Sequence, residues 1–171
     1  MVKSAKDAAD ALAALSAMDV IGFDTESKPT FVKGKCRPAR TWCSWQPTRP
    51  RSCSRSAPSR AVDVLKAVLE SASILKVGFG LQDDVKRLRA KLGIEAANVL
   101  DLSTALRKKN ERNTLGAKTA VARYFGQTLQ KSKKITTTNW ALPRLSEKQI
   151  LYAADDAHVA LKIYRHWRAA T

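Results

Sequence analysis

The sequence predicts a layered α/β domain, because short apolar runs typical of strands alternate with longer segments of helical periodicity. Its 171 residues are enough for one domain with its own core, and we expect a single domain over residues 1–171. A hydrophobic content of 44% suits a folded globular protein. We see neither a secretory signal nor the roughly 20 apolar residues of a membrane helix. The expected location is therefore the cytoplasm, without membrane attachment.

The amino-terminal half begins with a helix and a strand. Ser4 is suited to cap a helix that runs to about Met18, since Ala and Leu recur there at helical spacing. The apolar run at 20–23 predicts a buried strand with a polar end. A second helix over 61–71 and a second strand over 74–79 follow.

The remaining elements continue the alternation. We expect these elements in order: a helix at 81–92 closed by Gly93, a strand at 98–102, helices near 103–109 and 115–125, the second ended by Gly126, a polar loop at 127–139 and a last helix at 146–168. Ser146 and Gln149 have the spacing of a capping box at the start of this last helix.

The charge balance favours a polyanionic partner. The formal net charge is +16, and a basic surface of this size attracts phosphates. A merely soluble basic surface explains the charge equally well. Residues 36–60 hold six arginines and no acid, and removing those six charges from +16 still leaves +10.

Residues 36–60 differ in composition from the rest of the chain. They contain all three cysteines, four of the six prolines and two of the four tryptophans, without periodicity. The cysteine spacing fits no zinc site. Four prolines argue against a central strand. Either a basic nucleic-acid-binding loop or a disordered insertion would account for this composition.

A third hypothesis is that this segment is translated out of frame. Arg, Pro, Ser, Cys and Trp are what GC-rich DNA gives in a wrong frame, and a shift back by one base permits the sequence VPTGPHVVQLATDKTAFLFPFGAVA. The single Trp codon requires Val from Trp42-Cys43 and Ala from Trp45-Gln46. The shifted sequence contains two strand-like runs, VVQLAT and TAFLFPF. On this hypothesis the chain as written has lost its second and third strands, and the codons of the gene test it.

Acidic residues are few, but several lie at the predicted ends of strands and helices, where they could form a catalytic or metal-binding site. Asp24 and Glu26 are two apart at a strand end, so their side chains share one face. Asp84, or Asp83 in the neighbouring register, opens a helix, where a carboxylate is also favoured by the helix dipole. Each such acid taken alone is more often structural than catalytic.

The last predicted helix adds two more candidates. Tyr152 and Asp156 are four apart and lie on one face, whereas Asp155 is turned by roughly 100°. Converging carboxylates suit Mg²⁺ or Mn²⁺, and two such ions support phosphodiester hydrolysis. His158 is turned by roughly 200° from Asp156 and is expected on the helix surface.

The ordered motifs resemble the DEDD 3′–5′ exonuclease superfamily, in its tyrosine-bearing branch of ribonuclease D and Werner-type domains. The three motifs are IGFDTESKPTF, KVGFGLQDDVKRL and NWALPRLSEKQILYAADDAHVALKIY. The resemblance spans about 19–35 and 61–168. It departs from the family at Pro143-Arg144-Leu145, where Arg-Pro-Leu is usual, and over residues 36–60.

The resemblance implies a ribonuclease H-like fold, a mixed sheet flanked by helices, and a 3′–5′ exonuclease with two divalent cations. It assigns Asp24, Glu26, Asp84 and Asp156 to metal binding and Tyr152 to positioning the attacking water. Its substrate would be DNA or RNA with a free 3′ end, with DNA favoured by the first motif.

Two further residues could touch the substrate, and two rival functions remain open. Phe31 could stack on a nucleotide and Lys134 could meet the backbone, while Trp140 is equally suited to anchor the core. One rival is RNA trimming of the ribonuclease D kind. The other is a non-catalytic nucleic-acid-binding or damaged gene product, which would need no divalent ion.

Overall fold

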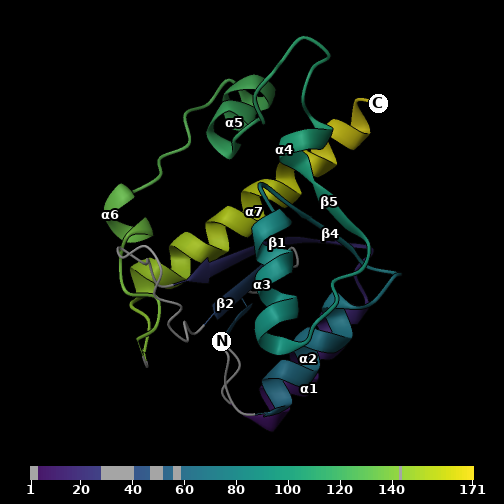
Figure 1. The fold of residues 1–171 in the computed structure, drawn as a ribbon, viewed down its shortest axis with the longest axis vertical. Helices are drawn as coiled ribbons and strands as arrows, with labels where there is room; N and C mark the ends of the chain where they lie inside the picture. The colour runs from purple at the N-terminus through teal and green to yellow at the C-terminus, as the bar shows by residue number, and fades with distance from the viewer. Residues whose placement is uncertain (1–3, 28–40, 47–51, 56–58, 143) are drawn as a thin grey trace.

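The structure is a computed structural model that describes residues 4–27, 41–46, 52–55, 59–142 and 144–171 (Figure 1). For residues 41–46, 52–55, 59–61 and Lys133 it describes the backbone alone. Among the described residues, no helix is long and apolar enough to cross a membrane.

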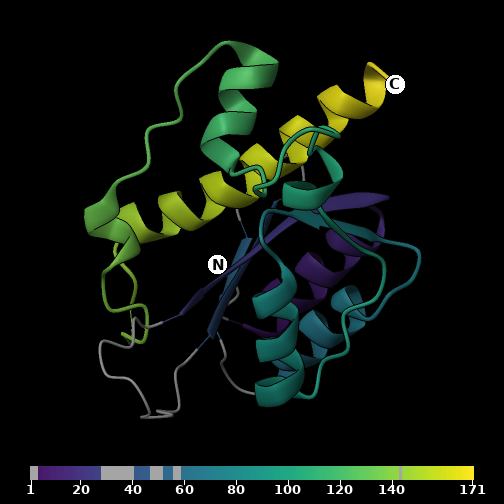
Figure 2. The same ribbon diagram turned by 45° about the horizontal axis from the view of Figure 1, so that its top comes forward.

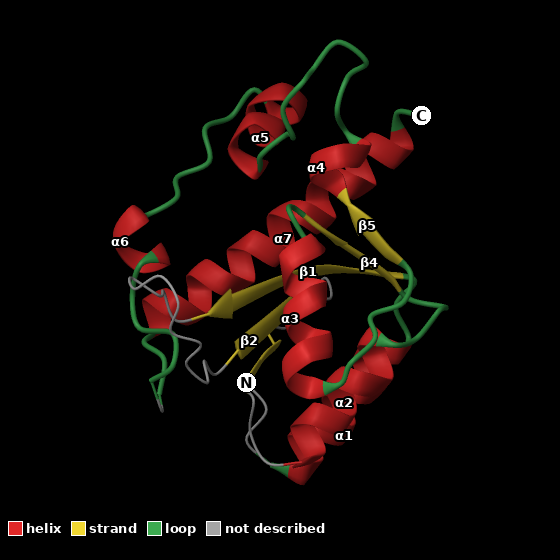
Figure 3. Cartoon of the chain, in the orientation of Figure 1, coloured by secondary structure: helices red, strands yellow, loops and turns green. Residues whose placement is uncertain are grey.

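A sheet forms the centre of the molecule, with helices on both faces (Figure 3). Its strands are β1 (Val20–Ser27), β2 (Thr41–Gln46), β3 (Ser52–Arg55), β4 (Leu75–Gly78) and β5 (Val99–Asp101), in the order β3-β2-β1-β4-β5. Strands β1, β4 and β5 are parallel to one another, and β2 is antiparallel to both β1 and β3. The expected α/β class and mixed sheet are therefore present.

Strands β2 and β3 correct the prediction that residues 36–60 have lost two strands. The backbone of β2 pairs with β1 from Gly22↔Gln46 to Ser27↔Thr41, and β3 pairs with β2. Strand pairing uses backbone N–H and C=O groups, which every residue except proline supplies. The segment's four prolines lie outside both strands, at positions 38, 47, 50 and 58. They therefore remove no donor from either strand.

Three helices cover one face of the sheet. α1 (Ala5–Ser16) starts at a capping box in which Ser4 and Asp7 bond to each other's backbone, as the sequence predicts for a Ser4 cap. α2 (Ser59–Leu69) packs beside it, and α3 (Gln82–Leu92) ends at Gly93, whose φ of +62° is the left-handed conformation expected of a helix end.

The other face carries the remaining helices. They are α4 (Leu102–Ala105), α5 (Ala117–Phe125), α6 (Lys133–Thr136) and α7 (Glu147–Ala169). The predicted capping box of Ser146 and Gln149 opens α7, and α5 ends at Gly126 as predicted. Helix α4 is shorter than the expected 103–109, and α6 lies inside the expected loop at 127–139.

The short helix α6 was not predictable from periodicity, because four residues do not complete two turns. It is held by local bonds: the backbone N–H groups of Ile135 and Thr136 and the Thr136 hydroxyl all donate to the carbonyl of Ser132. Ile135 packs on the buried Trp140. Figure 2 shows how the chain leaves α5 and reaches α6 beside the first turns of α7.

The sheet separates two apolar cores. Ile21 and Phe23 of β1 point toward α1, α2 and α3, where they join Leu65 and Leu88. Val20 of β1 points to the opposite face and joins a core that includes residues of α4, α5 and α7. Because successive strand residues alternate between faces, this register also decides the directions of residues 24–26.

Candidate active site

Two acidic side chains at the end of β1 point toward α7. Phe23 is buried on the α1–α3 face, so alternation along the strand places Asp24 and Glu26 on the α7 face and the buried Thr25 on the α3 face. The sequence prediction that the two acids share a face is thereby confirmed in the structure.

Helix α7 can reach these acids because it approaches β1 unusually closely. A Cβ atom added to Gly22 would lie 1.9 Å from the Ala157 carbonyl oxygen. On the side of α7 that meets the sheet, Ala153, Ala157 and Ala160 are buried. Small side chains on both elements thus bring Asp156 next to the end of β1.

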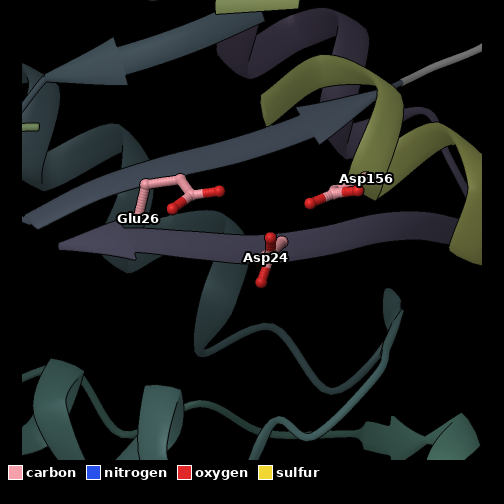
Figure 4. A group of neighbouring side chains, drawn as sticks. All are labelled: Asp24, Glu26 and Asp156. Carbon is pink, nitrogen blue, oxygen red and sulfur yellow. The ribbon is translucent and has the colours of Figure 1, made fainter. Parts of the chain in front are cut away.

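Asp24, Glu26 and Asp156 form one cluster, in which each offers a carboxylate oxygen and the three oxygens lie within 4.8 Å of one another. In Figure 4 the carboxylates of Glu26 and Asp156 point toward each other, and Asp24 lies between them in this view. Hard oxygen donors in such a group fit Mg²⁺ or Mn²⁺ better than zinc. The residues present therefore fit a divalent cation.

The cluster disfavours its own negative charge. Burial raises the pKa of Asp24 well above its usual value, and the neighbouring Glu26 and Asp156 raise it further. Burial, together with Asp156, raises the pKa of Glu26 to about 8. The pKa of Asp156 is also raised by burial, although Lys131 pulls it in the opposite direction. A bound cation would relieve this repulsion.

Asp84 lies near the cluster but outside it. It belongs to the first turn of α3, and its Oδ1 accepts a hydrogen bond from the Thr25 hydroxyl on the other face of β1. The Arg87 guanidinium lies 3.8 Å from the same oxygen and donates to Ser27 Oγ over 3.2 Å. Burial raises the pKa of Asp84, while the Thr25 hydrogen bond lowers it.

The two aspartates at the start of α3 are easily told apart. The side chain of Asp83 is 73% exposed and pairs with Lys86, whereas that of Asp84 is 11% exposed. Asp84 is thus the one turned toward β1. The structure brings three of the four predicted carboxylates together. Thr25 and Arg87 hold the fourth, Asp84, on the α3 side of β1.

Tyr152 lies one turn before Asp156 on α7. Its hydroxyl is 2.9 Å from Thr136 Oγ1 of α6, and its ring is tilted against buried Trp140 at a centroid distance of 6.1 Å. Burial raises the pKa of Tyr152, with a smaller contribution from Asp156, so the phenol keeps its proton at neutral pH. Helix α6 therefore fixes the direction of the hydroxyl.

Lys131 is a site residue that the sequence interpretation missed. Its Nζ lies 2.7 Å from Asp156 Oδ1 and 5.7 Å from the centre of the Tyr152 ring. It belongs to the segment between α5 and α6, which has no period to predict the direction of a side chain. The only sequence signal was the basic character of 127–139.

The remaining candidates fall as follows. Phe31 lies outside the described residues. Lys134 is exposed on α6, close in sequence to Thr136. His158 is exposed on α7, as predicted, and Trp140 is fully buried, which fits a core anchor.

Comparison with known sequences places the chain among 3′-5′ exonucleases. The chain matches the family described as 3′-5′ exonuclease over residues 1–169. The mouse bifunctional 3′-5′ exonuclease/ATP-dependent helicase WRN is 32% identical over 153 residues, covering 88% of this chain and 11% of the mouse protein. Human exonuclease 3′-5′ domain-containing protein 2 is 32% identical over 102 residues, covering 58% of this chain and 16% of the human protein. The chain spans less than a fifth of the length of these relatives.

Solved structures share the fold. Escherichia coli RNase D superposes with a TM-score of 0.78 at 22% identity, over 99% of this chain and 45% of that chain. Trypanosoma brucei RNase D in complex with RNA U12 gives a TM-score of 0.80 at 20% identity, over 96% of this chain and 60% of that chain. The parallel strands β1, β4 and β5 with their flanking helices thus match the fold of these RNase D structures.

Proposed function

Since the chain belongs to the 3′-5′ exonuclease family, we propose that it is a metal-dependent enzyme that hydrolyses nucleotides from the 3′ end of a nucleic acid, with DNA favoured over RNA. The observation that carries this proposal is the meeting of Asp24, Glu26 and Asp156 within 4.8 Å at the junction of β1 and α7. Metal-dependent phosphodiester hydrolysis uses such an oxygen-lined cation site, whereas simple binding of nucleic acid does not need one.

In this proposal Asp24, Glu26 and Asp156 would hold one divalent cation, and Asp84 would contribute to holding a second. When bound, such a pair of ions supplies an activated water and stabilises the attacking and leaving oxygens. The first position is supported by the three-carboxylate cluster. The second rests on the nearness of Asp84, whose charge raises the pKa values of Asp24 and Glu26.

Tyr152 is proposed to orient the attacking water. Its hydroxyl is within hydrogen-bond distance of Thr136, and its raised pKa keeps it protonated, so it can serve as both donor and acceptor. An oriented water near a carboxylate-held cation begins the reaction from a favourable geometry. Phe31 and Lys134 are proposed as weaker contacts to the terminal nucleotide and the backbone.

The strong positive charge supports a polyanionic substrate. Residues 102–171 contain 14 lysines and arginines against four acids, and two of those acids are the adjacent Asp155 and Asp156. Binding to phosphates should accordingly weaken as salt rises. We favour DNA because the mouse relative with exonuclease and helicase activities covers 88% of this chain. RNA is the second candidate, favoured by the fold shared with an RNA-bound RNase D.

The deciding experiment follows 5′-labelled DNA and RNA oligonucleotides with Mg²⁺ or Mn²⁺. We expect a ladder that shortens from the 3′ end and disappears with EDTA. Asp24→Ala and Asp156→Ala should lower the rate by about a thousandfold or more, in the range lost when key active-site groups are removed.

A matched control is available in the neighbouring acid. Asp155→Ala removes an exposed carboxylate from the same helix turn and should leave the rate within about twofold. A folded wild-type chain that binds oligonucleotides without cutting them, with or without metal, would overturn the enzyme proposal in favour of a non-catalytic binding protein.

A further inference from the structure

Lys131 places a positive charge inside the carboxylate site. Its Nζ is 2.7 Å from Asp156 Oδ1, a distance typical of a charge-assisted hydrogen bond. The Lys131 side chain is 29% exposed and that of Asp156 is 11% exposed, so water screens this pair less than a surface pair.

The charge of Lys131 acts on the whole cluster and not on Asp156 alone. It lowers the pKa values of both Asp24 and Glu26, against the other influences that raise them. Burial by itself would lower the pKa of Lys131, but Asp156, with smaller contributions from Tyr152 and Asp24, outweighs burial and raises it. The ammonium is therefore held charged by the same carboxylates that would bind a metal ion.

We propose that Lys131 is the internal counter-ion of this site, occupying the cation position at Asp156 in the metal-free protein and leaving it when a divalent ion binds there. The inference rests on the proposed function, because it takes the cluster to be a metal site. It makes Lys131 a residue that sets metal affinity, a role separate from holding the ion.

The competition follows from the shared ligand. An oxygen of Asp156 that accepts a hydrogen bond from an ammonium 2.7 Å away has no room on that side for a divalent ion such as Mg²⁺, whose ligand distances are about 2.0–2.1 Å. Binding of one cation therefore weakens binding of the other by the same factor. The departure of Lys131 would break no helix or strand hydrogen bond of its own segment, since residues 127–132 form neither element.

The contact also supplies a positive charge to the carboxylate cluster in the absence of a metal ion. Removing the Lys131 charge removes the cation that competes for Asp156, so the affinity of the site for a divalent cation should increase. A substitution that merely damaged the site would have the opposite effect on metal affinity, because misplaced ligands bind metal more weakly.

The test is a calorimetric titration of the full chain with Mn²⁺ in the absence of nucleic acid. Lys131→Met should bind Mn²⁺ about tenfold more tightly than wild type, within the usual range of coupling between competing ligands. Lys131→Arg should stay near wild type, since it keeps a cation at this place. Lys118→Met, which removes an exposed charge from α5, is the matched control and should change nothing.

A second variant and a second measurement guard against misfolding. Lys131→Gln keeps a polar side chain but removes its charge, and the rise in Tm on adding Mn²⁺ should be larger in it than in wild type. Equal or weaker Mn²⁺ affinity in both neutral variants would overturn the role of Lys131 while leaving the exonuclease intact. A wild-type chain that binds no Mn²⁺ and cuts nothing would instead overturn the proposed function itself.

Discussion

Glu26 is a partly buried acid whose surroundings favour the protonated form. Burial and Asp156 raise its pKa from 4.5 to about 8. A folded-state pKa above the unfolded one means that the folded protein binds more protons between these values. Stability is therefore present below about pH 4.5 and is lost as the pH rises toward about 8.

Glu26→Gln should consequently stabilise the metal-free protein in a pH-dependent way. In EDTA we expect a gain in unfolding free energy of about 1–3 kcal/mol at pH 8 and a much smaller gain at pH 5. Urea unfolding of both proteins at the two pH values measures this difference. Exposed Glu95→Gln is the control, and an equal gain from Glu26→Gln at both pH values would contradict the argument.

Thr25 acts on the site from the opposite face of β1. Its buried hydroxyl donates to Asp84, and that bond lowers the pKa of Asp84. Thr25→Val keeps the shape but leaves the carboxylate without its donor, so we expect the single-turnover cleavage rate to fall roughly tenfold. Thr25→Ser, which retains a hydroxyl, should remain within about threefold of wild type. Similar rates for Thr25→Val and wild type would show that the bond has no part in catalysis.

At the scale of elements, the approach of α7 to β1 determines whether the site exists. Gly22→Ala would place a Cβ atom 1.9 Å from the Ala157 carbonyl oxygen, a backbone atom that cannot move alone. We expect a loss of unfolding free energy of about 3 kcal/mol or more, or failure to fold.

Gly116→Ala provides the comparison for Gly22→Ala, because nothing lies within 4 Å of the added Cβ and the φ of Gly116 is −82°. Its unfolding free energy should change by less than about 1 kcal/mol. Thermal and urea unfolding distinguish the two variants. A Gly22→Ala protein as stable as wild type would mean that α7 does not sit this close to β1.

Strand β4 carries another group with a displaced pKa, on the face away from the carboxylate cluster. Lys76 is fully buried and donates to the carbonyl oxygens of Ser71 and Ile74 at 2.6 and 2.8 Å. Burial lowers its pKa from 10.5 to about 8. Between these values the unfolded chain binds more protons than the folded one, so this group adds stability as the pH rises from about 8 to about 10.5.

Lys76→Met should abolish that rise. The unfolding free energy of wild type relative to that of the variant should increase by up to about 3 kcal/mol from pH 8 to pH 10.5. Denaturant titrations across this range measure the difference in unfolding free energy, and groups common to both proteins cancel. A difference that stays constant with pH would mean that Lys76 titrates alike in the folded and unfolded states.

For the whole molecule, the sequence predicted much more of the order of elements than of their contacts. The strand carrying Asp24 and Glu26 and the capped start of α7 follow from local periodicity and capping, which need no tertiary information. Lys131 and the Thr25–Asp84 bond could not be predicted that way. They join segments that are distant in sequence, and no periodic pattern specifies such contacts.

For residues 36–60 the sequence composition predicted no regular strands, yet the structure has two. Composition argued against strands, yet backbone pairing tolerates it because all four prolines fall outside β2 and β3. The position of β2 at 41–46 closely matches the run VVQLAT of the shifted frame, at 42–47. Strand β3 at 52–55 falls within the run TAFLFPF, at 50–56. The frame hypothesis itself remains a prediction about the gene.

A chimera separates the explanations of this segment. Replacing residues 36–60 by VPTGPHVVQLATDKTAFLFPFGAVA should raise the unfolding free energy by about 2 kcal/mol or more, because β2 lies between β3 and β1 and apolar side chains suit an interior strand. Circular dichroism with urea gives the stability, and oligonucleotide anisotropy gives the affinity. Unchanged stability with a large loss of affinity would favour a basic binding loop instead.

The carboxylates that meet at the site come from positions 132 apart, Asp24 on β1 and Asp156 on α7. Contacts of such long range carry a cost in loop-closure entropy and cannot form before both segments are present. A ribosome-bound chain that has not yet released α7 would therefore lack the complete cluster, however well β1 has formed. On the proposed function, hydrolytic capacity would then appear only with α7, so a product truncated before it would be unable to degrade nucleic acid.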